Sequence, residues 1–385
     1  MASSTITKGN APPPNNWASP GPAAYDFRSD TITTPTTSML SAIQSTTLLD
    51  DVLCEDTTTT SLESHMASLT SHEAALFVLS GTMGNQLALR CHLTQPPHAV
   101  LCDHRAHILV HEAGGVASLC GAMVQGVVPK NGKYLTLEDI QKNIVLSDDV
   151  HACPTRVISL ENTIGGTITP LSEIQRISAF ARENGVKLHL DGARLWEAAA
   201  ASGVPISEWC APFDSVSLCF SKGLGAPAGS ILVGRKEFIK HARWIRKSIG
   251  GGLRQSGVLT SAARVAVEQT FGRKPNGSDG KLRQVHGIAK RLGSTWRKLG
   301  GQFEEGKEVE TNMLWLDLEK AGWSDEEFAK LGEERGVKLW SGRIVCHYQI
   351  RCDAVERLEG VFEEVLSRKG KRSEEVNGEG KRTYK

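Results

Sequence analysis

The sequence predicts an α/β fold in which a mainly parallel sheet is covered by helices on both faces. Three observations predict it. Short apolar segments typical of buried strands recur along the first two thirds of the chain, segments with helical spacing separate them, and polar residues follow several of the strands. Strands that are buried on both faces and joined by helices favour a parallel sheet. The 385 residues, 40% of them hydrophobic, provide for a large core and a second, smaller domain.

The first predicted elements are a helix, a strand and a second helix. Leu62, Met66 and Leu69 fall at helical spacing, and the apolar run EAALFVLS after them is predicted as a buried strand. The segment SGTMGN then leads into a helix predicted over residues 85–93. The next predicted strand is AVLCD, at residues 99–103.

The central part of the chain repeats this alternation. RVISLEN, at residues 156–162, is predicted as a strand, and Asn184-Gly185 is the predicted end of the helix after it. The apolar face of that helix consists of Leu171, Ile174, Ile177 and Ala181. Three further strands are predicted from VKLHLD, DSVSLCFS and GSILVG.

Composition suggests the domain boundaries. The glycine-rich segment GRKPNGSDGK is predicted as a linker, and NMLWLDL and a final helix over residues 354–366 indicate a smaller C-terminal α+β domain. Both ends of the chain are polar and are predicted as flexible tails. The predicted division is a tail over 1–24, a large domain with an N-terminal arm over 25–271, a linker over 272–281, a small domain over 282–368 and a tail over 369–385.

Charge and composition exclude several classes of function. The chain has 44 basic and 43 acidic residues and a formal net charge of +1, so no overall field attracts nucleic acid or a membrane surface. No apolar run approaches the roughly 20 residues of a membrane helix. Nine cysteines without a C-x-x-C pair indicate reduced thiols. We expect a soluble cytoplasmic protein with a small-molecule substrate and no nucleic-acid or membrane partner.

Polar side chains follow three of the predicted strands. In SGTMGN, backbone amides and the Thr82 hydroxyl could hold a phosphate at a helix N-terminus. LHLDGAR places Asp191 and Arg194 directly after a strand, and CFSKGLG places Lys222 after the next one. Taken singly, each has a structural explanation: a tight turn, a helix N-cap or a solvated strand end. Because ligands gather at the carboxyl ends of parallel strands, together they predict one site with a phosphate cradle, a carboxylate and an amine.

One cofactor uses all three groups. Pyridoxal 5′-phosphate (PLP) has an aldehyde that condenses with a lysine, a phosphate that takes backbone donors, and a ring nitrogen that an acid keeps protonated. In this interpretation Lys222 carries the cofactor, and Asp191 holds its ring nitrogen and makes the ring an electron sink.

Ordered motifs extend the interpretation to nearly the whole chain. They are DFRSDTITTPT, EAALFVLSGTMGNQLAL, AHILVHEAGG, ISLENTIGGTITPL, LHLDGARLWEA, CFSKGLGAPAGSILVG and GGGLRQSG, followed by TNMLWLDL and RIVCH. With these motifs the sequence resembles the threonine aldolase group, in the beta-eliminating lyase family of fold-type-I PLP enzymes, from Tyr25 to about Thr270 and again in the C-terminal domain. The resemblance implies the PLP-dependent transferase-like fold of aspartate aminotransferase, with residues 25–271 as the PLP-binding domain.

The resemblance also implies roles for residues around the cofactor. Lys222 matches the lysine that forms the Schiff base, and Asp191 matches the partner of the pyridine nitrogen. Gly81 and Thr82 match positions at the phosphate. His107 matches the histidine that stacks on the cofactor ring.

A second group of implied residues lies towards the substrate and the neighbouring subunits. Ser29, Arg194 and Arg343 would hold the substrate carboxylate, a task that suits bidentate arginine geometry, and Arg194 would also border the cofactor. His151 matches the histidine near the substrate hydroxyl. Arg254 matches a position that reaches the phosphate across a subunit interface, because family members are usually homotetramers built from dimers with shared sites.

The sequence departs from the family pattern in two places. The family usually has G-D-D-V-Y-G-x-D where this chain has LDDVLCED at residues 49–56, and often has E-N-T-H-N where this chain has ENTIG at residues 161–165. The changed residues Leu53, Cys54 and Ile164 could reshape the substrate end while leaving the cofactor end intact.

The segment DHRAHILVHE offers an alternative use of histidine. His107 and His111 are four residues apart on a predicted helix, with His104 and Glu112 nearby, a spacing that can bind zinc. Because the segment already has a role in the family and no second ligand cluster is apparent, we predict no metal.

The implied reaction is cleavage of a β-hydroxy-α-amino acid, such as L-threonine or L-allo-threonine, to glycine and an aldehyde. His151, with His107 nearby, would take the proton of the β-hydroxyl. A near alternative is an amino-acid racemase, such as an alanine racemase, in which Lys222 and a histidine or water would serve the two faces of Cα. A third alternative is a non-catalytic PLP-fold binding protein, against which the intact Lys222, Asp191 and Arg194 argue.

Overall fold

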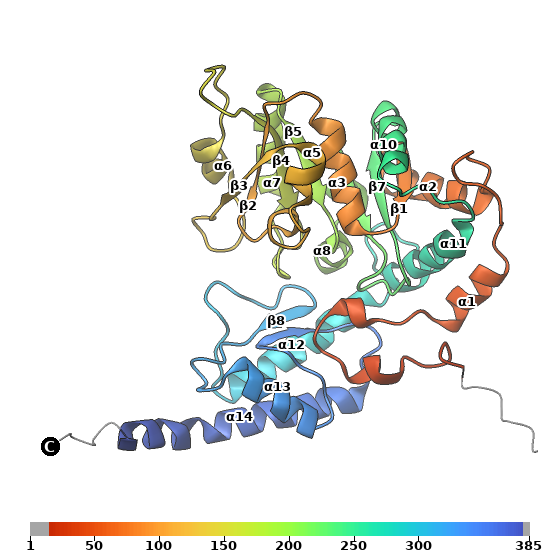
Figure 1. The fold of residues 1–385 in the computed structure, drawn as a ribbon. Coiled ribbons are helices and arrows are strands. Elements are labelled where there is room, and N and C mark those ends of the chain that lie inside the picture. Colours follow the sequence, from red (N-terminus) through yellow and green to blue (C-terminus); the bar gives the residue numbers. More distant parts are fainter. Residues whose placement is uncertain (1–14, 380–385) are drawn as a thin grey trace, which may run out of the picture.

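A seven-stranded sheet forms the centre of the larger lobe in the computed structural model, which describes residues 15–379 (Figure 1). The strand order is β1-β7-β6-β5-β4-β2-β3, and only β7 runs antiparallel to its neighbours. The predicted α/β fold with a mainly parallel sheet is therefore confirmed. The strands are β1 (Ala74–Val78), β2 (Ala99–Asp103), β3 (Met123–Val127), β4 (Thr155–Glu161), β5 (Lys187–Asp191), β6 (Ser215–Cys219) and β7 (Ser230–Gly234).

The reversed direction of β7 has a simple cause. Residues 220–229 alone connect β6 to β7, whereas a parallel neighbour needs a crossover of about a dozen residues or more. This short connection carries Lys222. The sequence predicted the strand but not its direction.

Helices cover both faces of the sheet, as predicted. Apolar residues of α3, α5 and α10 pack on one face, and those of α2, α6, α7 and α9 pack on the other. The helices of this lobe are α1 (Thr37–Gln44), α2 (Thr57–Thr70), α3 (Gly81–His92), α4 (His107–Val110), α5 (Gly115–Cys120), α6 (Leu137–Asn143), α7 (Leu171–Glu183), α8 (Leu195–Ser202), α9 (Ile206–Cys210), α10 (Lys236–Ser248) and α11 (Gly257–Ala266), which Val267–Phe271 extends as a π-helix.

Helix α3 begins four residues earlier than the sequence predicted. The Ser80 hydroxyl accepts a hydrogen bond from the Met83 amide at 3.1 Å, so Ser80 is the N-cap. Gly81 and Thr82, which were assigned to the turn, therefore form the first turn of the helix.

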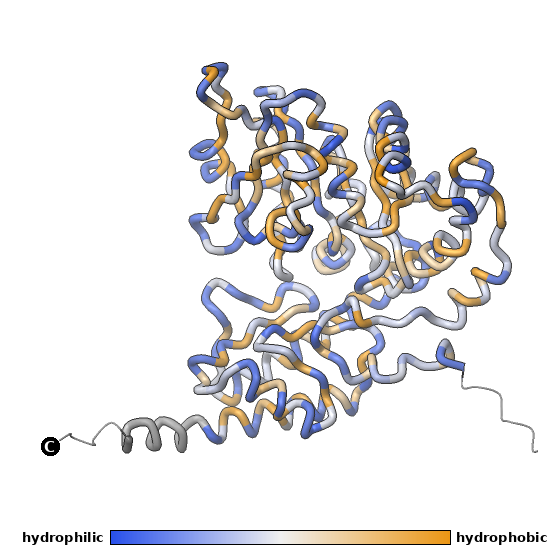
Figure 2. Tube along the Cα trace, viewed as in Figure 1, coloured by the Kyte–Doolittle hydropathy of each residue, from blue (hydrophilic) through white to orange (hydrophobic). Residues whose placement is uncertain are grey.

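The smaller lobe has a core of its own. Trp296, Phe328 and Phe362 are buried among aliphatic side chains there, and Figure 2 shows apolar residues interspersed with polar ones along its helices. Its elements are α12 (Leu282–Lys298), β8 (Met313–Trp315), α13 (Asp325–Glu334), β9 (Arg343–Val345) and α14 (Cys352–Glu379), and β8 pairs antiparallel with β9.

The first part of the N-terminal arm packs on the small lobe. Phe27 is fully buried in the small-lobe core, and its backbone pairs with Lys338 and Val345. Ala23 and Ala24 are also buried, inside the predicted tail. The predicted boundary at residue 25 therefore differs from the observed packing; residues 1–14 lie outside the described part of the chain.

The predicted linker is an ordered turn. The Asp279 carboxylate accepts hydrogen bonds from the amides of Arg273 and Lys274. At the other end of the small lobe, α14 continues to Glu379, eleven residues into the tail predicted over 369–385; residues 380–385 are not described.

The segment after β4 is hydrogen-bonded to the small lobe. Trp315 Nε1 donates to the Gly165 carbonyl, and Thr311 Oγ1 donates to the Gly166 carbonyl, both at 2.8 Å. The amide of Ile168 donates to Glu310 Oε2 at 2.9 Å. We call these three contacts the interdomain clamp.

No helix between residues 15 and 379 combines the length and apolar character that a membrane crossing would require.

Candidate active site

The carboxyl ends of β1, β4, β5 and β6 lie at one edge of the sheet, because these strands run in the same direction. Glu161 ends β4, Asp191 ends β5, and Lys222 follows β6. The charges of Asp191 and Lys222 both act on Glu161, so the three groups lie close together. The fold thus brings together the lysine and the aspartate that the sequence singled out.

Lys222 is held in a rigid turn. Its carbonyl accepts hydrogen bonds from Thr33 Oγ1 at 2.8 Å and from the Gly225 amide at 2.9 Å. Gly225 has a φ of +86°, and a Cβ there would collide with the Tyr348 ring. The glycines after Lys222 therefore allow close contact with the small lobe, and they fix the backbone from which the amine extends.

Asp191 accepts hydrogen bonds from both sides. Oδ2 is 2.7 Å from Asn85 Nδ2, and Oδ1 is 3.0 Å from the amide of Ala193. Asn85 Nδ2 also lies 2.8 Å from Glu112 Oε1. The sequence assigned no role to Asn85 and suggested Glu112 only as a possible metal ligand, although both lie inside quoted motifs.

His107 lies beside the carboxylates at this edge of the sheet. Its Nδ1 lies 2.8 Å from Glu112 Oε1, and its amide donates to Glu161 Oε2 at 2.9 Å. The hydrogen bond to Glu112 raises the pKa of His107 above its usual value, against the effect of burial. Burial and the charge of Asp191 raise the pKa of Glu161 to about 7. A histidine with a raised pKa and a carboxyl group with a pKa of about 7 therefore adjoin Asp191.

Replacing Glu112 with glutamine should lower the pKa of His107. The amide cannot balance an imidazolium charge, and burial then dominates, so we expect the pKa of His107 to fall from its raised value. The measurement is an NMR titration of the histidine ring protons, with the other histidines as internal references. In the parent, the stabilisation from His107 is complete below about pH 6.5 and is lost as the pH rises through its raised folded-state pKa; the variant should lose this dependence. An unchanged titration would contradict the role of Glu112.

The carboxylates here could in principle hold a cation. The ligand atoms of His107, Glu112 and Asp191 all lie within 4.8 Å of one another. However, the Asn85 amide nitrogen already donates to both carboxylates, and its N–H groups would oppose a cation at that position. His111 is the C-cap of α4, with its ring centroid 5.5 Å from that of His107. The absence of a metal remains a prediction.

The N-terminus of α3 can accept an anion. The first-turn amides of an α-helix have no partners within the helix, and Gly81 and Thr82 are in that turn. Ser230 Oγ is buried without a hydrogen-bond partner and lies 3.7 Å from where a Cβ on Gly81 would be. An unpaired buried hydroxyl beside a helix N-terminus suits a phosphate oxygen.

Arg194, which was predicted to hold a substrate carboxylate, is already paired. Its Nε and Nη2 donate to the two oxygens of Asp30 at 2.8 Å and 2.6 Å. Burial raises the pKa of Asp30, but Arg194, Lys222 and Arg343 outweigh it and lower this pKa to about 2. Ser29 caps the short helical turn that carries Asp30, and its hydroxyl accepts from the Thr31 amide at 3.2 Å. Asp30 is a site residue that sequence reasoning missed, one position after Ser29.

Arg343 is the other cation of this group. It begins β9, opposite Trp315, and its guanidinium carbon lies 5.7 Å from the Trp315 ring centroid. Burial and the charge of Arg194 lower the pKa of Arg343. Within residues 15–379, no carboxylate forms an ion pair with Arg343. Because a partly buried cation is costly without a counter-ion, this arrangement suits an anionic ligand.

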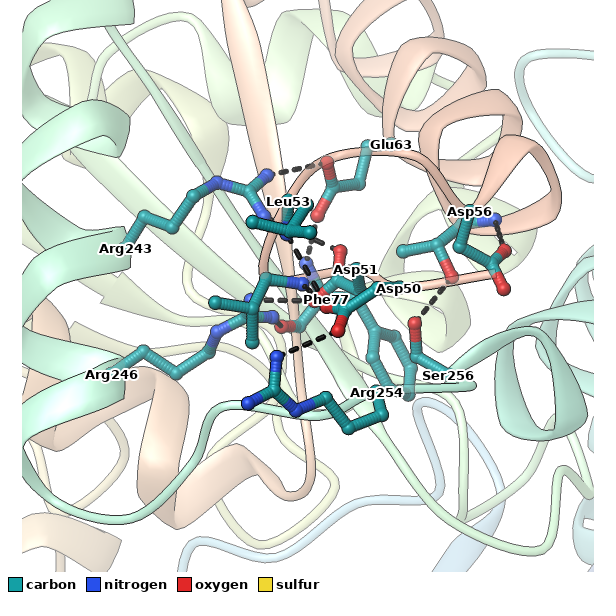
Figure 3. A network of polar contacts seen from close by, with 12 residues as sticks. Asp50, Asp51, Leu53, Asp56, Glu63, Phe77, Arg243, Arg246, Arg254 and Ser256 are labelled. Carbon is teal, nitrogen blue, oxygen red and sulfur yellow. Dashed lines mark hydrogen bonds and ion pairs between the residues drawn. The ribbon is translucent and has the colours of Figure 1, made fainter. Parts of the chain in front are cut away.

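Arg254 lies on the surface in a network of ion pairs (Figure 3). Its Nη1 is 2.6 Å from Asp50 Oδ2, and its side chain is 58% exposed. The neighbouring Asp51 carboxylate pairs with Arg246, which also donates to the Phe77 carbonyl. The network fixes the segment LDDVLCED, and the contact that Arg254 makes in it does not reach the Lys222 site.

His151 lies far from Lys222 in the same chain. It precedes β4 by four residues, at the amino edge of the sheet, and β4 is seven residues long, or roughly 20 Å. The side chain is 89% exposed and pairs with Asp149 at 2.8 Å. The predicted position beside the substrate is therefore not formed within one chain, and the role would require His151 from a second copy.

Comparison with known proteins identifies the family. Residues 26–319 match the beta-eliminating lyase model. An aldolase of Penicillium aethiopicum is 52% identical, with 93% of this chain and 90% of the relative covered. An alanine racemase of Cochliobolus carbonum is 48% identical, covering 91% and 90%, and a low-specificity L-threonine aldolase of Eremothecium gossypii is 46% identical, covering 92% and 91%.

Solved structures show the same fold. A putative L-allo-threonine aldolase of Listeria monocytogenes has a TM-score of 0.69 at 25% identity, over 85% of this chain and 92% of that one. A structure described as SPT with PLP has a TM-score of 0.66 at 17% identity, over 90% of this chain and 88% of that one, and thus has the same fold. The motifs, the fold and these similarities together show that the chain belongs to the beta-eliminating lyase family.

Proposed function

We propose that the protein is a PLP-dependent lyase that cleaves β-hydroxy-α-amino acids, such as L-threonine or L-allo-threonine, to glycine and an aldehyde. One observation carries the proposal: the guanidinium of Arg343, which has no ion-pair partner in the described residues, and the Lys222 amine both act on Asp30, and Lys222 also acts with Asp191 on Glu161. The site therefore offers a carboxylate anchor next to the groups that PLP requires. The relatives named as threonine aldolases support this choice of reaction.

The residues present fit PLP. Lys222 provides an amine for the aldehyde, Asp191 provides a carboxylate for the ring nitrogen, and the first turn of α3 with Ser230 provides donors for the phosphate. When bound, the cofactor supplies an electron-poor ring that stabilises the charge left on Cα.

The side chains of the site have separable tasks. Arg343 binds the substrate carboxylate and thereby fixes the orientation of Cα. Asp30 keeps Arg194 in place and neutralises its charge. His107 and Glu161 are the groups of this chain that hold or move a proton beside the reacting atoms, and His151 of a second copy is the proposed base for the β-hydroxyl.

Replacing Arg343 with lysine should weaken substrate binding. Lysine keeps the charge but loses the planar fork, so we expect KM for L-threonine to rise about 10- to 100-fold with a smaller change in kcat. The cofactor absorption should not change. Arg297→Lys, an exposed arginine of the same lobe that pairs with Glu308, is the control. A KM equal to that of the parent would exclude this role of Arg343.

A second candidate function is racemisation of an amino acid. The 48% identical relative named as an alanine racemase favours it. Ile164, at the position where the family often has histidine, is buried and lines a small pocket with Glu161 and Tyr134. The substrate end therefore differs from the family pattern, while the cofactor end is intact.

One experiment separates the two reactions. The purified protein is incubated in heavy water with L-threonine and, separately, with L-alanine, and acetaldehyde, α-deuterium exchange and chirality are followed. The lyase predicts acetaldehyde from threonine and no D-alanine. D-Alanine without acetaldehyde would establish the racemase instead. If acetaldehyde, D-alanine and α-deuterium exchange were all absent, the protein would be a binding protein.

We also propose a cytoplasmic homotetramer in which sites are shared between copies. The positions of His151 and Arg254, away from Lys222 of their own chain, support shared sites. Leu53 and Trp244, 65% and 70% exposed, adjoin the Asp50 network and are suited to an interface. Light scattering should give about four times the 41.7 kDa chain mass; a monomer would refute the assembly.

A further inference from the structure

Asn85 joins two carboxylates of the candidate active site, Asp191 and Glu112. It lies on α3 and is 1% exposed. Its Nδ2 is 2.7 Å from Asp191 Oδ2 and 2.8 Å from Glu112 Oε1. Asp191 is the proposed partner of the cofactor ring, and Glu112 holds His107. A single amide nitrogen thus connects the two carboxylates.

The orientation of the amide follows from its surroundings. The nitrogen donates two hydrogens and the oxygen only accepts, so the reverse orientation would place an oxygen against two carboxylates. Oδ1 therefore faces His189 Nε2 at 3.1 Å, and Nε2 must carry the ring hydrogen. Burial lowers the pKa of His189 to about 4, which keeps the ring neutral and leaves Nδ1 as an acceptor.

The same direction of donation continues away from the site. Ser215 Oγ lies 2.8 Å from His189 Nδ1 and 2.8 Å from His92 Nε2. Burial lowers the pKa of His92 to about 3, so that ring is neutral too. His92 donates to Ser215, Ser215 donates to His189, and His189 donates to Asn85. Each bond polarises the next, with the N–H groups of Asn85 directed at the carboxylates.

We propose that Asn85 is a positioning residue that offsets the repulsion between the Asp191 and Glu112 carboxylates, which lie side by side. Two buried carboxylates this close repel each other unless donors lie between them. The amide gives one N–H to each. Only the identity of the ligand that Asp191 meets rests on the proposed function, because the paired carboxylates belong to the chain itself.

Other charged and polar groups around the pair do not replace the amide. His107 donates from α4 to Glu112, and Gln86 Nε2 donates to Glu112 at 2.5 Å. Glu161, from β4, adds a carboxyl group whose charge interacts with that of Asp191. Lys222 follows β6 and acts on Glu161 and His107. Asn85 is the side chain that bonds to both members of the pair.

The first test is the thermal unfolding midpoint of the full-length, cofactor-free protein between about pH 5.5 and about pH 8. Asn85→Leu keeps the side-chain volume but removes both N–H groups, so the pair should hold a proton to higher pH in the folded state than in the unfolded state. Stability from such a proton is present at low pH and is lost as the pH rises. We expect the midpoint to lie below that of the parent by a few degrees more at pH 8 than at pH 5.5.

The matched control is Asn162→Leu. Asn162 is also buried, but its amide bonds to the backbone N–H and carbonyl of Thr169 rather than to a carboxylate. The Asn162→Leu substitution should lower the unfolding midpoint by the same amount at every pH.

Asn85→Asp is the second variant. It keeps the shape of the side chain and adds a third carboxyl group, so its unfolding midpoint should fall with rising pH more steeply than that of Asn85→Leu.

The second readout is the tautomer of His189, from nitrogen-15 NMR of the cofactor-free protein. The parent should carry the hydrogen on Nε2, whereas Asn85→Leu removes its acceptor and should move the hydrogen to Nδ1, facing Ser215. A pH-independent effect of both Asn85 variants, or an unchanged tautomer, would overturn the inference. Neither readout uses cofactor or substrate, so a protein that shows both changes but cleaves no amino acid would refute only the proposed function.

Discussion

Replacing Lys222 with alanine should abolish turnover and remove the covalent link to the cofactor. No other amine is placed in the rigid connection between β6 and β7, which holds the lysine beside Asp191. We expect cleavage of L-threonine to fall by about a thousandfold or more. In the parent, borohydride treatment after loading with PLP should leave the cofactor mass on the peptide that contains Lys222.

The control for this variant is Lys281→Ala. Lys281 is half-buried against the Tyr348 ring, 4.6 Å from its centroid, and thus borders the same turn without entering the strand-end cluster. It should keep both the borohydride adduct and most of the activity. If Lys222→Ala still fixed the cofactor to one peptide, the assignment of Lys222 would be wrong.

Replacing Asp191 with asparagine should reduce turnover by several powers of ten while the cofactor stays bound. The ring nitrogen would lose the anion that keeps it protonated, and with it the stabilisation of charge on Cα. A loss of about 3 kcal/mol or more in transition-state stabilisation corresponds to at least a hundredfold in kcat. The measurement is kcat with L-threonine, together with the absorption spectrum of the loaded protein.

Asp103→Asn is the matched control, because Asp103 ends β2, two strands from β5 in the sheet, and pairs with Arg105. Its kcat should remain within a few-fold of the parent value. Near-normal turnover in Asp191→Asn would show that another group partners the ring nitrogen.

The sequence predicted the fold well because the dominant signals are local. Buried strands such as AVLCD and the helical face around Ile174 and Ile177 are properties of short segments. The direction of β7 depended instead on the length of its connection, and the packing of Phe27 depended on a lobe more than 250 residues away in the chain. Neither has a signal in its own segment.

The candidate site was predictable to the extent that its residues follow strands. Asp191 and Lys222 needed only the rule that parallel strands end at one edge. Asp30 and Asn85 were missed because their partners, Arg194 and Asp191, lie more than 100 residues away. His151 shows the opposite limit: motif similarity indicates a role, but not whether the same chain or another copy supplies the side chain.

The interdomain clamp has a consequence for timing. Trp315 and Thr311 donate to consecutive backbone carbonyls after β4, and Arg343 lies opposite Trp315 on the neighbouring strand. Any hinge motion that moved Arg343 away from Lys222 would have to break these bonds at once. Substrate exchange should therefore rely on fast side-chain rearrangement rather than on a slow opening of the two lobes. The rate of each catalytic cycle would then be set by the chemical steps, and solvent viscosity would have little influence on it.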